Sequence, residues 1–187
     1  MGYIYNDLKP DNMLIGVENQ LESHSQQGES QVSSIVRNKN DIVMVDFGLL
    51  SEYMQPNGDH IKMEKINKFR GSFLFASKNA FNYYKTSRRD DFLSLMYNLV
   101  YMLDAQRLSI LRKIKSSDDQ FFDKIKAAKL NMTIDDLCGQ NLGQSRAFLI
   151  RPFIEEVMSY SFSETPNYEK LKFLLEKVLL DRKSIPM

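Results

Sequence analysis

The sequence has little cysteine, little net charge and no long apolar run. Its single cysteine, Cys138, excludes an intrachain disulfide and suits a reducing compartment. A formal net charge of +1 gives no general positive field for nucleic acid or for an anionic membrane. No zinc-ligand spacing is present, no charged-then-apolar leader stands at the N-terminus, and no apolar run approaches the roughly 18 residues of a membrane span. We therefore expect an intracellular protein, in the cytoplasm or the nucleus, that binds neither nucleic acid nor membrane.

The composition is that of one globular domain over residues 1–187. Hydrophobic residues make up 43% of the chain and charged residues 26%, which is enough apolar sequence for a sizeable core. Residues 17–40 are rich in Gln, Ser, Asn and Glu and predict a polar loop insertion, in which His24 is a solvated residue rather than a metal ligand. One local basic cluster is present: Lys68, Arg70, Lys78, Lys85, Arg88 and Arg89.

Two short apolar runs flank the polar segment. Residues 12–16 and 41–45 are typical of paired strands, and a hairpin between them would carry Asn12 and Asp46 to the same place. Residues 48–87 show no long period and contain a strong turn signal at 56–59, which predicts an extended segment.

The second half of the chain predicts helices. Ser87 to Asp90 has the spacing of a capping box, and apolar residues on more than one face of 88–103 predict a buried central helix. Ser117 and Thr133 are candidate caps of shorter elements, and Cys138 is then a core residue at a helix end. Pro152 either kinks a helix over 146–160 or marks its start, and Thr165-Pro166 suits the cap of a last amphipathic helix.

Four polar residues near the N-terminus predict phosphoryl-transfer chemistry. The chain reads D-L-K-P-D-N from Asp7 to Asn12 and V-D-F-G around Asp46. A carboxylate at Asp7 can orient an attacking hydroxyl, Lys9 can meet the transferring phosphate, and Asn12 with Asp46 can hold magnesium. Either short motif is common by chance, but the two together at this spacing are specific.

The chain resembles the eukaryotic protein kinases, and within them the casein kinase I group. G-S-F-L-F-A-S-K-N-A from Gly71 is similar to that group's G-T-A-R-Y-A-S-x-N-A, and S-R-R-D-D-F-L-S-L from Ser87 to its S-R-R-D-D-L-E-S-L. K-L-N-M-T-I-D-D-L-C from Lys129 resembles its K-M-S-T-P-I-E-V-L-C, and P-N-Y from Pro166 its P-D-Y. The likeness runs nearly from end to end.

The resemblance implies the C-terminal lobe of a Ser/Thr kinase, mainly α with a small β-hairpin (α+β), that uses ATP and Mg²⁺ on protein substrates. Asp7 is then the catalytic base, Lys9 binds the phosphate, and Asn12 and Asp46 bind magnesium. Ser72 keeps the hydroxyl that braces the catalytic Asp and Lys in the family. The resemblance further implies that Asp91 holds the catalytic loop through backbone hydrogen bonds, and that 46–80 is the activation and substrate-binding segment.

The departures from the family point to a fragment. The sequence contains no glycine-rich phosphate loop, no strand lysine with its partner glutamate, and no helix ahead of the catalytic loop, so a partner could cover an exposed helical face. The H-R-D triplet reads Y-N-D at Asp7, and Leu74 replaces an arginine that reads phosphorylated or acidic substrate residues. An inactive kinase lobe that scaffolds other proteins stays open as the alternative to an enzyme.

Overall fold

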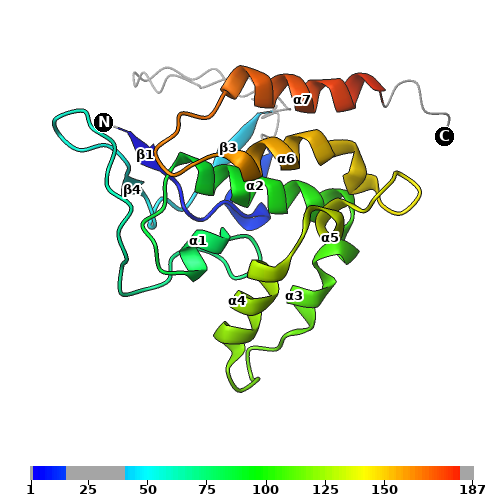
Figure 1. Cartoon of the computed structure of the whole chain (residues 1–187), viewed down its shortest axis with the longest axis horizontal. Coiled ribbons are helices and arrows are strands. Elements are labelled where there is room, and N and C mark those ends of the chain that lie inside the picture. The colour runs from blue at the N-terminus through cyan, green and yellow to red at the C-terminus, as the bar shows by residue number, and fades with distance from the viewer. Residues whose placement is uncertain (1, 16–40, 182–187) are drawn as a thin grey trace, which may run out of the picture.

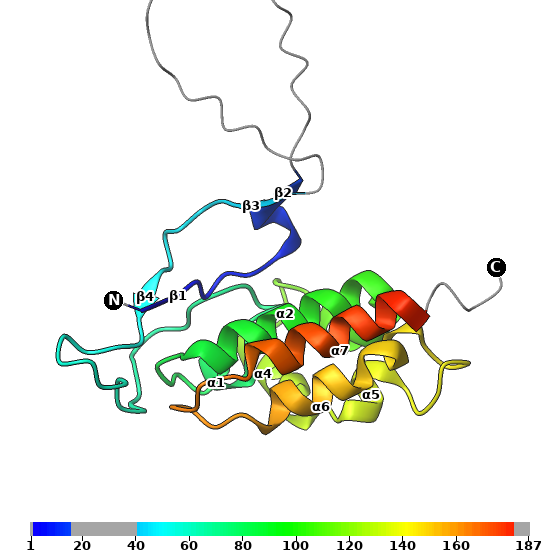
Figure 2. The ribbon, with the colours of Figure 1, turned by 90° about the horizontal axis from the view of Figure 1, so that it is seen from above.

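A computed structural model describes residues 2–15 and 41–181. The predicted loop of 17–40, with His24, lies outside these residues. About half of the structure is helical, and the strands form only small antiparallel sheets, which confirms the expected fold class. In Figure 2 the strands lie along one side of the helical body. No helix in the described part of the chain is long and apolar enough to cross a bilayer.

Helix α2 (Arg88–Leu103) is the centre of the core, as the sequence predicted. Ser87 and Asp90 form the expected capping box, and Met96 and Val100 are fully buried. Figure 1 shows α2 running across the middle of the molecule, where it packs against α6 (Arg151–Ser159).

The remaining helices surround α2. They are η1 (Pro10–Asn12), α1 (Lys78–Phe81), η2 (Ala105–Leu108), α3 (Ser109–Lys113), α4 (Phe121–Asn131), α5 (Ile134–Cys138), η3 (Arg146–Ile150) and α7 (Tyr168–Asp181). The buried apolar side chains of these elements form one cluster around α2. Helix α7 buries only a narrow stripe, and Phe173, Leu179 and Leu180 remain exposed on it.

The helix starts test the predicted caps. Thr133 caps α5 with a capping box to Asp136, and Pro152 lies in the first turn of α6, so it marks a start and not a kink. Two caps were wrong. Helix α4 begins after Gln120, whose backbone is left-handed at φ 60° and which provides no side-chain cap. At α7 it is the Asn167 side chain, and not Thr165, that accepts from the Lys170 amide at 3.0 Å.

Strands β2 (Met13–Ile15) and β3 (Ile42–Met44) form the expected antiparallel hairpin, with Met13 opposite Met44. A second pair, β1 (Tyr3–Ile4) with β4 (Ser51–Glu52), was not predicted, because two-residue strands leave no periodic signal. Together the pairs hold the chain on both sides of residues 5–12.

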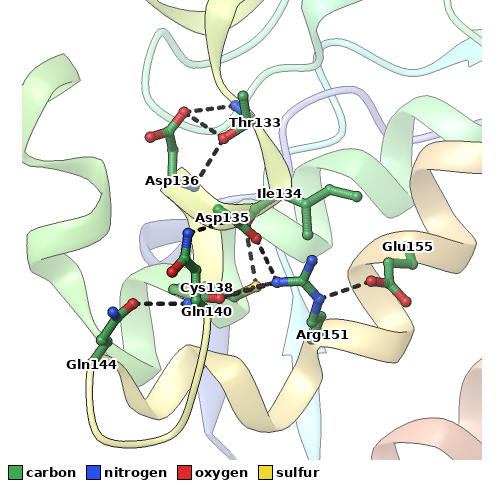
Figure 3. Close-up of polar contacts among 10 residues, drawn as sticks. Thr133, Ile134, Asp135, Asp136, Cys138, Gln140, Gln144, Arg151 and Glu155 are labelled. Carbon is green, nitrogen blue, oxygen red and sulfur yellow. Dashed lines mark hydrogen bonds and ion pairs between the residues drawn. The ribbon is translucent and has the colours of Figure 1, made fainter.

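Arg151 joins α5 to α6 (Figure 3). Its guanidinium contacts Asp135 at 2.6 Å and Glu155 at 2.9 Å, and donates to the Gly139 carbonyl at 3.1 Å. The hydrogen bond from Arg151 lowers the pKa of Asp135. Cys138 lies beside this group at the end of α5, buried as the sequence predicted, and burial raises the pKa of its thiol. This cysteine is a core residue rather than a nucleophile.

Candidate active site

The loop between β1 and η1 brings together three of the predicted residues. Asp7 is only 8% exposed, and its Oδ2 lies 2.7 Å from Lys9 Nζ and 3.1 Å from Asn12 Nδ2. Asn12 Nδ2 also donates to the Asp7 carbonyl at 3.0 Å. The hydrogen bond to Asp7 raises the pKa of Lys9, so the lysine is firmly a cation. Within the described chain the second oxygen, Asp7 Oδ1, receives no hydrogen bond, which leaves it available to a further donor.

Asp46 follows β3 and reaches the same region through its neighbour Val45. The Val45 amide donates to the Asn12 carbonyl at 3.1 Å, and the Tyr5 hydroxyl donates to the Val45 carbonyl. Tyr5 also packs edge-on against Phe47, with ring centroids 5.7 Å apart. Asp46 itself is left-handed at φ 60°, with its Oδ1 accepting from the Gly48 amide at 3.2 Å. Residues of the loop that contains Asp7 therefore fix the backbone at Val45, the residue before Asp46.

The oxygen atoms at Asn12 and Asp46 are of the kind that magnesium binds. Mg²⁺ is a hard cation that takes one or two protein oxygen ligands and fills its other positions from phosphates and water. Asn12 Oδ1 and Asp46 Oδ2 accept no hydrogen bond from residues 2–15 and 41–181, while Asn12 is buried and Asp46 is exposed. No group of three or more His, Cys, Asp or Glu residues suited to a metal occurs in the described ranges. The donor chemistry of Asn12 and Asp46 is therefore compatible with magnesium.

Ser72 is placed beside the loop but not bonded to it. Gly71 has φ +106°, and a Cβ built there would lie 2.8 Å from the Asn6 carbonyl oxygen, so only glycine allows this approach. The Ser72 carbonyl accepts from the Ala76 amide at 2.7 Å. In the described structure its hydroxyl forms no hydrogen bond with Asp7 or Lys9, and the bracing role stays a prediction.

Helix α2 holds the loop at two points on one of its faces. Asp91 accepts from the Tyr5 amide at 2.6 Å and from the Asn6 amide at 2.8 Å, which confirms its expected role. Burial raises the pKa of Asp91, and the two amides oppose that shift. Seven residues later Asn98 Nδ2 donates to the Leu8 carbonyl at 2.8 Å. Spacing by two helical turns places both side chains on the same face.

Asn6 is a site residue that the sequence reasoning undervalued. Its side chain is buried, and Nδ2 donates to the Leu49 carbonyl and to Ser51 Oγ, both at 2.8 Å. Its Oδ1 accepts from Thr86 Oγ1 at 2.5 Å. Its backbone is left-handed at φ 68°, a conformation that asparagine tolerates better than most residues. The sequence showed only a lost arginine, whereas the structure shows a neutral link between three segments.

Lys129 of α4 was also missed. It is 1% exposed, and its Nζ donates to the Ala76 carbonyl at 2.6 Å and lies 3.6 Å from the centroid of the Tyr97 ring. Burial lowers the pKa of Lys129 well below its ordinary value of 10.5. Lys129 thus ties the segment after Ser72 to the helical core. The signal available in the sequence was a lysine at i+4 from the core residue Ile125 on the same helix face.

Three members of the predicted basic cluster are engaged by other parts of the fold. Arg88 and Arg89 donate to backbone carbonyls in residues 160–163 at 3.2 and 3.3 Å, and Lys85 pairs with Glu64 at 2.7 Å. These three cations therefore hold neighbouring segments of the chain.

Comparison with known proteins identifies relatives along nearly the whole chain. No protein-family model matches it. A probable casein kinase I homolog of Encephalitozoon cuniculi is 29% identical over 184 residues, which is 98% of this chain and 50% of that protein. Casein kinase I homolog 2 of Schizosaccharomyces pombe is 31% identical over 94% of this chain and 36% of that protein. Casein kinase I homolog 3 of Saccharomyces cerevisiae is 30% identical over 94% of this chain and 33% of that protein.

The chain thus spans half or less of the length of these relatives. The shared stretch contains the loop of Asp7, the hairpin and the helices around α2. The chain is therefore a homologue of the casein kinase I proteins, and it corresponds to a part of their kinase domain about the size of the C-terminal lobe.

Proposed function

We propose that this chain carries the catalytic loop of a Ser/Thr protein kinase of casein kinase I type, which transfers the γ-phosphate of ATP to protein hydroxyls. The observation that supports this most is the state of the Asp7 carboxylate. One of its oxygens is held by Lys9 and Asn12, and within the described residues the other has no donor. A carboxylate fixed by one oxygen presents the other in a defined direction, as a base that accepts a hydroxyl proton must.

Each remaining residue takes one role in the transfer. Asp7 Oδ1 accepts the proton of the substrate hydroxyl. At the same time the oxygen of that hydroxyl forms a bond to the γ-phosphorus of ATP, and the bond between this phosphorus and the leaving ADP breaks. Lys9, with a side chain 27% exposed, can turn from Asp7 toward the transferring phosphate. Asn12 Oδ1 and Asp46 would hold the magnesium, which when bound neutralises charge on the phosphates. Ser72 would brace Asp7 and Lys9 from the neighbouring segment.

The segments around the site have matching roles in this proposal. We assign residues 46–80 to the activation and substrate-binding segment, residues 88–103 to the central helix that supports the loop, and residues 17–40 to an insertion in the hairpin, all within one domain over 1–187. The activity belongs to an assembly larger than this chain, since the nucleotide cleft of a kinase lies between two lobes and the chain spans half or less of its relatives.

The test is a fusion of the N-terminal lobe of a related casein kinase I to this chain. We expect magnesium-dependent phosphate transfer to Ser/Thr of a protein substrate, and a loss of about 10²-fold or more in Asp7→Asn, because the acceptor of the hydroxyl proton is removed. The matched control is Glu169→Gln, a change at an exposed carboxylate on α7 outside the site and outside residues 46–80, which should keep full activity.

Equal phosphate incorporation by the fusion and its Asp7→Asn form would refute the assignment. A fusion that folds and binds ATP but transfers nothing would favour the alternative of an inactive lobe that binds other proteins.

A further inference from the structure

A cavity lies between β4, residues 61–70, α1 and the residues that lead into α2. Its volume is about 130 Å³. None of the four residues proposed for phosphoryl transfer lines it, so it is separate from the candidate active site. We call it the β4 cavity, and its lining includes Ser51, Ile61, Ile66, Ala80, Tyr84 and Thr86.

Hydrogen bonds connect the segments that form the β4 cavity. The Ile66 amide donates to the Tyr83 carbonyl at 2.7 Å, which joins residues 61–70 to the segment after α1. The side-chain amide of Asn6 bonds to both Ser51 and Thr86, which joins β4 to the start of α2. Because these bonds cross between the segments, the cavity is formed before any ligand binds, as small-molecule sites usually are.

Most of the lining is apolar. Ile61 and Ile66 come from the extended segment, Ala80 comes from α1, and Tyr84 is the aromatic residue of the wall. The size of the cavity suits one ring, since an engineered cavity of about 150 Å³ lined by Leu, Ile and Phe stays dry and binds benzene. The β4 cavity therefore has room for a single six-membered ring.

Two hydroxyl groups provide the polar part of the lining. Ser51 Oγ accepts from Asn6 Nδ2 at 2.8 Å, and Thr86 Oγ1 donates to Asn6 Oδ1 at 2.5 Å. Among residues 2–15 and 41–181, nothing accepts the Ser51 hydroxyl proton and nothing donates to Thr86 Oγ1. Both hydroxyls bind the same amide group, so they are neighbours. Since a hydroxyl both accepts and donates, one hydroxyl on a ligand can serve Ser51 and Thr86 together.

The charged residues of the lining compensate one another. Lys85 pairs with Glu64 at 2.7 Å, and the two other charged residues, Glu52 and Arg70, have opposite signs. A charged ligand would have to leave water without a net opposite charge to receive it, which is costly. The lining therefore favours an uncharged ligand.

We propose that the β4 cavity binds a small uncharged molecule with one aromatic ring and one hydroxyl, of which phenol is the simplest example. The ring packs on the apolar residues of the lining, and the hydroxyl accepts from Ser51 and donates to Thr86. Because these two residues also hold Asn6, the ligand joins the hydrogen-bond network that supports the loop of Asp7. The binding does not rest on the proposed kinase function.

The experiment titrates the isotope-labelled chain with phenol and, separately, with toluene, and follows the backbone amide shifts by NMR. Toluene has nearly the same shape as phenol but no hydroxyl. We expect the largest shifts at the residues that line the β4 cavity. Phenol should bind about tenfold more tightly than toluene, since its hydroxyl forms two hydrogen bonds that toluene cannot form.

Thr86→Val removes one of the two hydroxyls and keeps the shape of the side chain. It should bring the affinity for phenol to within about twofold of that for toluene and leave the affinity for toluene unchanged. A general loss of structure would instead weaken both ligands. The matched control is Thr165→Val, at an exposed threonine outside the cavity, which should keep both affinities.

Ile66→Phe is a second variant, which keeps the proposal testable even where Thr86→Val fails to fold. Ile66 is only half-buried, so a larger side chain can be accommodated there, and its ring would occupy the space of the ligand. Both phenol and toluene should bind at least about tenfold more weakly. The matched control is Ile110→Phe, at an exposed residue of α3 outside the cavity, which should bind both as the wild type does.

Phenol that does not bind, or that binds no more tightly than toluene, would overturn the proposal. Unchanged affinity for phenol in Ile66→Phe would assign the binding to another surface and also overturn it. The proposal fails separately from the kinase function. Asp7→Asn should bind phenol as the wild type does, and a fused kinase that transfers phosphate but binds no phenol would refute this inference alone.

Discussion

Replacing Lys129 by methionine should change how the stability of the fold depends on pH. Lys129 is buried with an amine that has no acidic partner among its described contacts, which are the Ala76 carbonyl and the rings of Tyr97 and Phe81. Burial also raises the pKa of Tyr97, so that phenol stays neutral. The folded state therefore disfavours the ammonium form of Lys129, whereas the unfolded chain keeps it up to the ordinary pKa of 10.5.

The size of the effect follows from proton linkage. Below the ordinary pKa the unfolded chain binds a proton that the folded chain binds less tightly, so the free energy of unfolding rises as the pH rises. For one group the slope reaches about 1.4 kcal/mol per pH unit, through the window between the lowered pKa and 10.5. Methionine removes this slope. At the alkaline end Lys129→Met should be less stable than the wild type by about 1–3 kcal/mol, because the buried Ala76 carbonyl loses its donor.

Urea denaturation of both proteins at pH values from neutral to alkaline measures the difference directly. We expect the wild type to gain stability over Lys129→Met as the pH rises. Lys124→Met, at a more exposed lysine of the same helix, should run parallel to the wild type. A difference between the wild type and Lys129→Met that stays constant with pH would show that the buried amine is charged throughout, and would refute the reasoning.

Further predictions concern the loop, substrate choice and the surface. Gly71→Ala should destabilise the fold by about 2 kcal/mol in urea denaturation, since it combines a positive φ with a Cβ 2.8 Å from the Asn6 carbonyl; an unchanged midpoint would contradict it. Asn6→Ala should cost about 2–4 kcal/mol from lost hydrogen bonds and a strained φ, and a loss under about 0.5 kcal/mol would argue against the link it forms. In the fused kinase, Leu74→Arg should raise kcat/KM for a peptide with an upstream phosphoserine over its unphosphorylated form, unless a strong preference already exists with leucine. The chain alone should bind an apolar dye, and Phe173→Lys with Leu180→Lys should reduce that binding; a wild type that binds none would contradict an exposed face.

Elements with a strong local signal were predictable from the sequence. The capping box at Ser87 and the apolar pattern after it gave α2 its bounds, and two apolar runs gave the hairpin of Met13 and Met44. The start of α4 was not predictable, because Gln120 adopts a left-handed conformation that its residue type does not signal. Residues far apart in sequence left no signal for the pairing of β1 with β4.

The candidate site was predictable as a set of residues but not as a network. The short spacing between Asp7, Lys9 and Asn12 already implied one loop, and the structure gives it with direct hydrogen bonds. The supports were hidden, because Asn6 and Lys129 act through partners 40 or more residues away in the sequence. At Asn6 the sequence shows only that a charged arginine of the family is lost. It does not show the neutral hydrogen bonds that the asparagine side chain makes instead.

The neutral link at Asn6 also determines how the loop responds to its surroundings. Hydrogen bonds between an amide, two hydroxyls and a carbonyl are not screened by salt as ion pairs are, and none of these groups titrates near neutral pH. The order of the loop at this point is therefore present as soon as the chain folds, and it needs no phosphate to be added to residues 49–51 or to Thr86. High ionic strength and phosphatase treatment should leave the order of the loop unchanged.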